Sequence, residues 1–383
     1  DAPALSILST YYKPTGFSGA PIFSLPDIRN NASLKPERTK SLEAGLEASF
    51  WQGRVGFDFT WYKSSTVDQI MPVSVTAATG YSQEYVNAGE VSNKGIEASV
   101  YFTPVRSSSF SWTTTVNFAR NRNKVISLYS DVQNLLLLPP GYASLQGGIT
   151  VNAAVGQPYG ILRGTDYVYT NGQKTVNAQG YYMASSSNSV IGDPNPDWTG
   201  GVNNSFRYKD FGLSFLVDMR KGGDIFSLDQ WYGQGTGLYP NTAATNDLGN
   251  PSRNRISDGG GVILAGVKAD GTPNTTRVEN YDGYITPYGY ANNPPRAGYV
   301  YDGSYVKLRE VALRYSLPAK FISKIRPFKG IDVSLIGRNL WIIHKNIPYA
   351  DPEDALSSGN IRGYQSGSYP TVRNYGFNVK FML

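Results

Sequence analysis

The chain has 383 residues, a formal net charge of +6, 41 glycines, 23 prolines and 28 tyrosines, a composition that favours strands and turns over helices. With no cysteine and one histidine, it excludes disulfide scaffolds, thiolate metal sites and cysteine nucleophiles. The 35 basic residues are scattered, and no apolar run approaches the roughly 18 residues of a membrane helix, so neither a nucleic-acid partner nor a helical membrane protein is expected.

Alternating apolar and polar residues predict the first four strands as two hairpins. In the first hairpin the alternation covers residues 42–50 and 55–61, and Gln52-Gly53 forms the connection. In the second it covers residues 96–102 and 112–118, with a short turn at 104–109.

The later strands follow the same pattern. Residues 202–208 and 213–219 form a third hairpin that turns at 209–211, and residues 305–315 form the next strand. The phase of the alternation changes at Arg309-Glu310, which predicts a β-bulge. Residues 331–342 and 373–383 complete about nine strands, whose length suits tilted membrane strands of roughly 9–11 residues better than the ~5–6 of soluble sheets.

Short and long connections alternate along the chain. The short turns are 52–53, 104–109, 209–211 and 318–329, and the long loops are 67–90, 124–197, 222–302 and 343–372. A transmembrane β-barrel with short periplasmic turns and long extracellular loops has this asymmetry. We therefore expect the long loops outside the cell and Leu383 in the periplasm, while a soluble adhesin or lectin of long hairpins remains the alternative.

Each strand offers an apolar and a polar phase. The apolar phase predicts a lipid-facing set comprising Phe57, Phe59, Val100, Phe102, Val116, Phe215, Val217, Phe377 and Val379. The polar phase carries charged residues, either as a transport path or as side chains that a wet or plugged lumen tolerates: Glu43, Glu47, Asp58, Glu97, Asp218, Arg220, Arg309, Arg314 and Arg338.

Several motifs resemble the C-terminal barrel of SusC-like TonB-dependent transporters, the RagA/SusC type. They are NASLKPE at 31–37 leading into EAG at 43–45, NAG at 87–89 with NKGIE at 93–97, IGDPNPDW at 191–198 with GG at 200–201, GSYVKLREV at 303–311 closed by YSLP at 315–318, and GRNLW at 337–341 followed by DPE at 351–353. The resemblance covers roughly residues 30–383.

This resemblance implies a nutrient importer, not an enzyme, in the outer membrane of a Gram-negative bacterium of the Bacteroidota. Its cargo would be oligosaccharides, peptides or similar nutrients. The implied partners are a SusD-like surface lipoprotein that forms a lid, the TonB–ExbB–ExbD complex and the lipid bilayer. A passive outer-membrane pore or a surface adhesin is the alternative function.

We expect the chain to be an arc of a larger barrel of about 22 strands. Residues 1–38 would form an extracellular segment and residues 39–383 the C-terminal part of the barrel, whereas the plug domain and the TonB-contacting segment would lie outside this chain. The first and last strands should therefore not pair with each other, because each requires a partner strand elsewhere.

Candidate site residues are sparse. His344 is expected at the rim of the barrel, and no Gly-x-Ser-x-Gly motif accompanies it, so no catalytic residue is predicted. The acidic stretches 193–197 and 351–354 are interpreted as turns rather than calcium sites, and neither a metal nor a cofactor is expected. Loop 222–302 holds aromatic residues that would contact a ligand or a lid protein, or pack on the loop itself: Trp231, Tyr232, Tyr239, Tyr281, Tyr284, Tyr288 and Tyr290.

Overall fold

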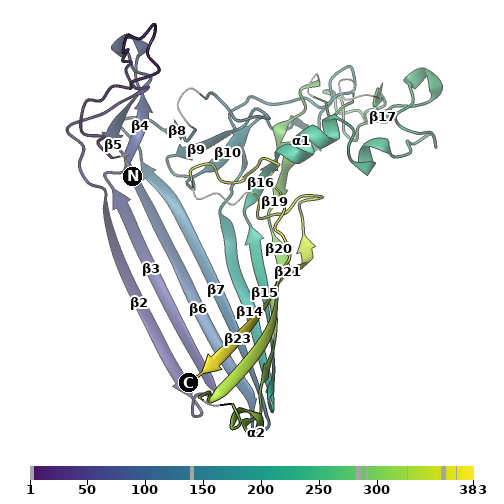
Figure 1. The fold of residues 1–383 in the computed structure, drawn as a ribbon. Coiled ribbons are helices and arrows are strands. Elements are labelled where there is room, and N and C mark those ends of the chain that lie inside the picture. The colour runs from purple at the N-terminus through teal and green to yellow at the C-terminus, as the bar shows by residue number, and fades with distance from the viewer. Residues whose placement is uncertain are drawn as a thin grey trace.

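The computed structural model describes residues 4–138, 142–281, 286–289, 292–325, 327–354, 359–367 and 369–383. Within these residues, nine long antiparallel strands form one sheet that makes the wall of the molecule (Figure 1). Its strands, in spatial order, are β2 (Arg38–Phe50), β3 (Val55–Val67), β6 (Glu90–Arg106), β7 (Phe110–Ser127), β14 (Pro196–Tyr208), β15 (Phe211–Gly222), β20 (Tyr305–Ser316), β21 (Gly330–Lys345) and β23 (Asn374–Met382).

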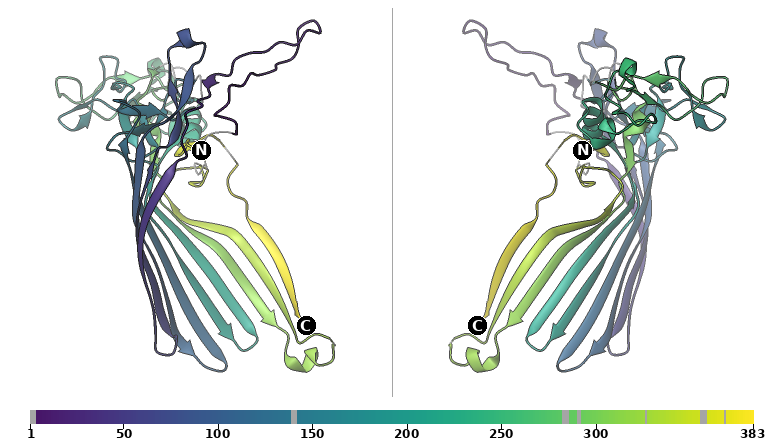
Figure 2. Two further views of the ribbon diagram at one scale, coloured as in Figure 1. Left: turned by 90° about the vertical axis from the view of Figure 1, so that its left-hand side faces the viewer. Right: turned by 90° about the vertical axis from the view of Figure 1, so that its right-hand side faces the viewer.

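The wall is an open sheet. Each long strand pairs with the next long strand along the chain, and the described residues show no ladder between β2 and β23, which form the two edges. Figure 2 shows the strands running obliquely side by side, with the two edges apart. The prediction of an arc of about nine strands whose first and last strands do not pair is confirmed.

The connections alternate as the sequence predicts. The short connections are residues 51–54, 107–109, 209–210 and 317–329, and the last of them contains helix α2 (Ala319–Ile322). The long connections are residues 68–89, 128–195, 223–304 and 346–373. All four long connections lie at one end of the wall, with α2 and the short turns at the other (Figure 1). Residues 4–37 also lie at the long-connection end, and β2 begins at Arg38.

One predicted boundary is wrong. The second short turn was expected from residue 104, but β6 continues to Arg106 through an irregularity in the pairing between Phe102 and Val105. Proline has no N–H to donate to a ladder, and bulges are among the places in a sheet where it is tolerated. Pro104 therefore interrupts the pairing without ending the strand.

Small elements fill the long connections and the segment before β2. They are β1 (Ile28–Arg29), β4 (Ile70–Ser74), β5 (Gln83–Asn87), β8 (Asn134–Leu136), β9 (Thr150–Ala154), β10 (Ile161–Gly164), β11 (Tyr169–Thr170), β12 (Gln173–Lys174), β13 (Ser189–Gly192), β16 (Asp224–Ser227), β17 (Val262–Ile263), β18 (Arg277–Val278), β19 (Val300–Asp302), β22 (Tyr364–Gln365), helix α1 (Leu228–Gly235) and the 3₁₀ turns η1 (Ala77–Thr79), η2 (Pro240–Ala243), η3 (Ile256–Asp258) and η5 (Arg296–Tyr299). None of the helices in the described part of the chain has the length and apolar character needed to traverse a bilayer.

The main hydrophobic core lies mostly in the long connections, and Val91 and Val125 at the adjoining ends of β6 and β7 complete it. Ile149, Val151, Leu162 and Phe226 are fully buried in these connections and pack with Trp231 in one cluster. In the described part of the chain the wall is a single layer with no second sheet against it. Large apolar side chains on the wall therefore stay exposed, and Phe59, for example, is 41% exposed. The end that holds the long connections is thus a packed cap on an open wall.

The pairing register sorts the wall into two faces. Phe57, Val100, Val116 and Val217 lie in one row across the sheet, because each is directly opposite its neighbour or shares Val202 as partner. The nine residues predicted to face lipid all belong to this apolar face. The nine predicted inward charges belong to the opposite, polar face.

Candidate functional site on the polar face

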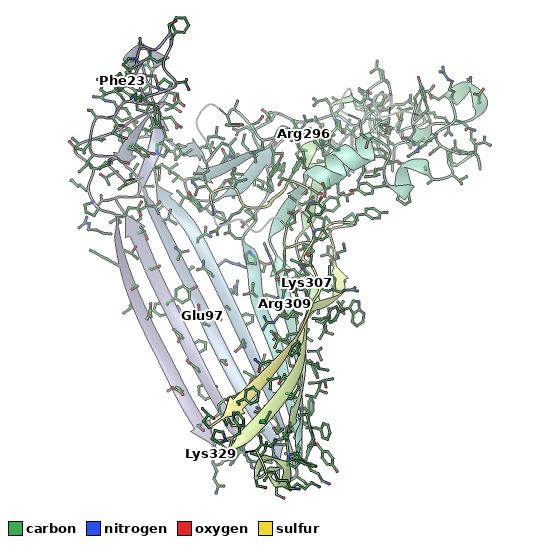
Figure 3. The ribbon with its side chains drawn as sticks, viewed as in Figure 1. Phe23, Glu97, Arg296, Lys307, Arg309 and Lys329 are labelled. Atoms are coloured by element: carbon green, nitrogen blue, oxygen red, sulfur yellow. The ribbon has the colours of Figure 1, made fainter. Side chains whose placement is uncertain are left out.

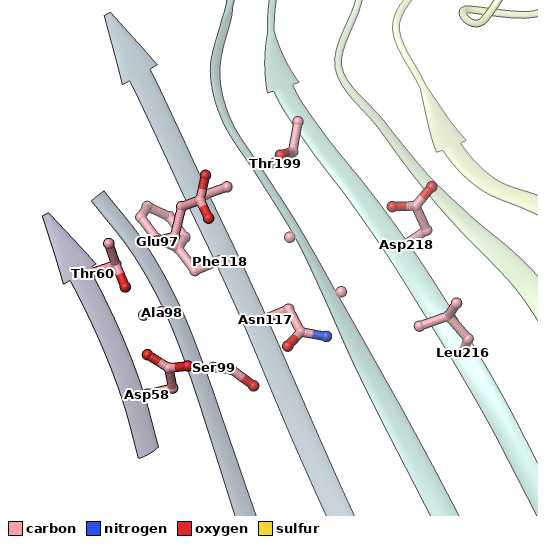
Figure 4. A pocket seen from close by; sticks show the side chains of 13 residues that line it. Asp58, Thr60, Glu97, Ala98, Ser99, Asn117, Phe118, Thr199, Leu216 and Asp218 are labelled. Atoms are coloured by element: carbon pink, nitrogen blue, oxygen red, sulfur yellow. The ribbon is translucent and has the colours of Figure 1, made fainter. Parts of the chain in front are cut away.

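A continuous polar row crosses seven strands of the wall. Adjacent strands place each member directly opposite the next: Glu47, Asp58, Ser99, Asn117, Gly201, Asp218 and Lys307. The side chains of Asp58, Ser99 and Asn117 are seen on neighbouring strands in Figure 4. Strand alternation is sufficient to build this row, because residues opposite each other in a ladder share one face.

Two recesses open along this face. The first has a volume of about 480 Å³ and is lined by the polar row around Asp58, Asn117 and Asp218 (Figure 4). The second has a volume of about 400 Å³, and its lining includes Tyr62 and Gln69. Glu97 borders both recesses, so they form one polar surface from the middle of the wall toward the long connections.

Asparagine side chains organise the second recess. Tyr62 Oη donates to Asn121 Oδ1 at 3.1 Å, and Asn121 Nδ2 donates to Asn93 Oδ1 at 3.1 Å. Asn123 Nδ2 donates to Asn195 Oδ1 at 2.9 Å. Amide and hydroxyl groups present donors and acceptors without net charge, which suits hydrogen bonding to uncharged polar groups of a ligand.

Carboxylates on the first strands of the wall carry unneutralised charge. Within the described part of the chain, Glu43, Glu47, Asp58 and Glu97 form no ion pair, and they lie on three neighbouring strands. This side of the polar face is therefore acidic. The opposite side, around β20, is organised differently.

A buried ion network ties the last long connection to β20. Lys307 Nζ lies 2.6 Å from Asp351 Oδ1 and 2.6 Å from Glu353 Oε2, and the side chains of Lys307 and Asp351 are each 3% exposed. Arg309 continues the network, with Nη2 at 2.8 Å from Glu353 Oε1 and Nε at 3.1 Å from Asp218 Oδ2. Figure 3 shows Lys307 and Arg309 close together on the wall, away from Glu97.

The predicted β-bulge places Arg309 in this network. The register of β20 against β15 and β21 skips Arg309, which confirms the bulge at Arg309-Glu310. On β21, Asn339 has φ of +52°, a conformation that Asn tolerates better than most residues, and its Oδ1 accepts from Arg309 Nη1 at 3.0 Å. The extra residue thus turns a guanidinium toward two carboxylates.

Hydrogen bonds keep the loop carboxylates of this network ionised. Burial alone would raise the pKa of Asp351, but hydrogen bonds from Lys307, Thr371 and the Glu353 backbone outweigh it and lower the pKa to about 2. Burial likewise opposes ionisation of Glu353, and hydrogen bonds from Arg309 and Lys307 lower its pKa nonetheless. Both residues act as anions that hold the loop onto β20.

The acidic stretches and the histidine noted in the sequence have plain structural roles. Asp193 Oδ1 accepts a hydrogen bond from the Asn195 backbone N at 3.0 Å, which is turn chemistry, and Asp351 and Glu353 form ion pairs with Lys307. His344 lies exposed near the end of β21, and its Nε2 is 3.1 Å from Asn346 Oδ1. This matches a position at the rim.

The predicted aromatic contacts separate into buried and exposed members. Trp231 is 4% exposed, its ring centroid lies 4.9 Å from that of Tyr299, and the Arg296 guanidinium stacks 4.5 Å from it. Tyr232 is exposed, whereas Tyr239 stacks on Tyr349 at 4.4 Å. Tyr281 lies 4.9 Å from the Arg255 guanidinium and Tyr288 is half-buried, while Tyr284 and Tyr290 lie outside the described residues. A ligand or lid contact by this set stays a prediction.

The sequence reasoning missed two parts of the site. Lys307 was not singled out, although it lies in the polar phase between Val306 and Leu308, and its burial depends on a loop some 44 residues away. The asparagines of the second recess were also missed. The available signal was their spacing, because Asn93 is four positions from Glu97 in β6 and Asn121 is four positions from Asn117 in β7, which puts them in the same polar phase.

Comparison with known proteins identifies the family. Residues 2–204 match the family described as "TonB dependent receptor-like, beta-barrel". The chain is 28% identical to TonB-dependent receptor P3 of Formosa agariphila, over 98% of the chain and 37% of that protein. It is 25% identical to TonB-dependent receptor SusC of Bacteroides thetaiotaomicron, over 92% of the chain and 32% of that protein.

Solved structures agree on the fold. The RagAB peptide importer in the "closed-closed" state superposes with a TM-score of 0.68 at 19% identity, over 97% of this chain and 38% of that one. The chain thus spans about a third of the length of these relatives. It belongs to the family of TonB-dependent receptor-like β-barrels and forms part of such a barrel.

Proposed function

We propose that this chain lines the path of a TonB-dependent importer that takes up oligosaccharides, peptides or similar nutrients in the outer membrane of a member of the Bacteroidota. The observation that carries this proposal is the polar face, where two adjoining recesses present amide, hydroxyl and carboxylate groups on a wall whose other face is apolar. The similar RagAB structure is that of a peptide importer, which supports a cargo of this class.

The proposed import requires parts outside this chain. The plug domain, the TonB-contacting segment and the remaining strands would come from the rest of a longer receptor, since the chain matches about 37% of its relative. Residues 1–38 would be an extracellular segment, and energy would come from TonB–ExbB–ExbD. These roles rest on the family membership and on the open sheet.

A SusD-like surface lipoprotein would cover the long connections. Loop 223–304 supports this assignment, because it presents exposed Tyr232 and Leu238 above a packed core that holds Trp231. An exposed aromatic ring on a rigid base is a common anchor at protein interfaces.

Uptake by the intact receptor tests the transport proposal. Deleting the receptor gene should abolish growth on the cognate nutrient, and deleting TonB should do the same while the receptor remains in the membrane. Growth that persists without TonB would instead indicate a passive pore.

Removing residues 270–295 should reduce co-purification of the lipoprotein. Trimming the exposed turn at residues 76–80 serves as the matched control, and equal recovery from both variants would place the interface elsewhere.

A further inference from the structure

The apolar face carries a recess next to the short turns. It has a volume of about 500 Å³ and is bounded by β14, β15, β20 and β21. Two adjacent register rows line it, and every side chain in them is apolar or aromatic: Phe206, Leu213, Leu313 and Leu335 in one row, and Tyr208, Phe211, Tyr315 and Val333 in the next.

The shape of the recess follows from residue size. Leu213, Leu313 and Leu335 are shorter than the rings around them, so they leave a trough between aromatic walls. The rings of Phe211 and Tyr315 are in contact at an interplanar angle of 36°, with their centroids 4.8 Å apart, and this contact supports the side of the recess nearest the turns. Leu313 is 53% exposed and Leu335 60% exposed, so the floor is open to an apolar occupant.

Exposed lysines lie in the two short connections that join the strands of this recess. Lys209 follows Tyr208 directly in the β14–β15 turn, and its Nζ lies 5.4 Å from the Tyr208 ring. Lys320 and Lys324 lie in the β20–β21 connection, and all three lysines are exposed. Among the described residues none of them has an ion pair. Asp210 is the acidic residue beside Lys209.

The end of the molecule that holds the short connections is basic as a whole. The four short connections contain six basic residues and one acidic residue, Asp210: Arg54, Lys209, Lys320, Lys324, Arg326 and Lys329. In the four long connections acidic residues outnumber basic ones, sixteen to nine. A basic rim beside a trough in the lipid-facing wall is complementary to an anionic lipid, with its chain against the wall and its headgroup at the rim.

We propose that the recess binds one acyl chain of an anionic phospholipid from the leaflet that borders the short turns, and that Lys209 and Lys320 bind its headgroup. Both ends of the lipid are then matched: hydrocarbon contacts Leu213, Leu313 and Leu335, and the phosphate meets lysines without a protein counterion.

Native mass spectrometry of the intact, delipidated receptor tests this site. Phosphatidylglycerol should bind more tightly than phosphatidylcholine with the same chains, and more tightly than phosphatidylglycerol with short chains. Lys209→Ala and Lys320→Ala should each weaken phosphatidylglycerol binding about fivefold, the equivalent of about 1 kcal/mol per lysine near an anionic surface, and Lys209→Arg should restore it. Lys13→Ala, far from the recess, should change nothing.

Filling the recess with a larger side chain distinguishes a specific acyl-chain site from general contact of the barrel with surrounding lipid. Leu313→Trp should displace the bound lipid, whereas Val116→Trp on the same face, outside the recess, should leave it bound. Each variant is first checked for membrane insertion and for the heat-dependent gel shift of a folded barrel. Equal binding of both headgroups, no effect of the lysine or Leu313 variants, or a dimer of receptors in place of the bound lipid would overturn the proposal.

Discussion

At the scale of single residues, Lys307 is a buried cation on a strand of the wall. Its ammonium group is nearly excluded from solvent and contacts two carboxylates from a distant loop, Asp351 and Glu353. Removing one member of a buried ion pair leaves the others charged and desolvated. The exposed pair between Arg338 and Glu310 on the same sheet offers a natural comparison, since water solvates both partners.

We predict that Lys307→Met destabilises the intact receptor by about 3–5 kcal/mol, because two buried carboxylates lose their counterion. Arg338→Met should cost about 0–1 kcal/mol. Guanidinium unfolding of the folded receptor in detergent measures both free energies. Similar costs for the two variants would mean that the network around Lys307 is solvated.

Acidification should release the same loop. The pKa of Asp351 is lowered to about 2 and that of Glu353 is also lowered, so both carboxylates contribute stability fully above their unfolded pKa values near pH 4. This contribution is lost as the pH falls from about 4 toward 2. We expect wild type to lose more unfolding free energy than Asp351→Asn over that range, as followed by denaturant titrations at each pH; parallel curves would argue against the lowered pKa.

At the scale of strands, alternation decides which face a side chain occupies and one bulge changes the phase. In β3, Phe59 lies on the apolar face and the next residue, Thr60, lines the first recess on the polar face. In β20 the extra residue Arg309 lets Lys307 and Glu310 share the polar face although three positions separate them. Without the bulge, one half of β20 would present its charges to lipid.

Phe59→Arg should reduce the folding free energy of the barrel by roughly 2–4 kcal/mol, because it places a guanidinium near the middle of the lipid-facing surface. Thr60→Arg, one residue on, should fold nearly as well as wild type, because its side chain enters a polar recess. Folding into lipid vesicles, scored by the gel shift of the folded form, compares the two. Equal yields would show that the faces are assigned the wrong way round.

At the scale of the whole molecule, the two ends of the wall differ in length of connection, in core and in charge. The long connections hold the buried core and an excess of acidic residues, and the short ones are basic. Every strand crosses from one end to the other, so the ends face opposite sides of the membrane. We predict that the long connections are extracellular and the short ones periplasmic, because long loops are extracellular in other barrels of this kind.

The absence of cysteine makes this orientation easy to test. Ser257→Cys in the long loop 223–304 should react with an impermeant maleimide on intact cells, and Ser323→Cys in the short connection 317–329 should react only after the outer membrane is opened. Both serines are exposed, so accessibility within the protein is matched. Labelling of Ser323→Cys on intact cells would reverse the topology.

The sequence alone determined the wall. Strand identity, the two faces, the bulge at Arg309 and the alternation of connections all depend on period-two patterning and on residues adjacent in the chain, which are local signals. The site required the tertiary structure. Lys307 meets Asp351 only because a 28-residue connection folds back onto β20, and Trp231 became core rather than surface because distant segments pack around it. Local patterning fixes which face a side chain occupies, but contacts between residues far apart in sequence depend on how the loops close, which no periodicity encodes.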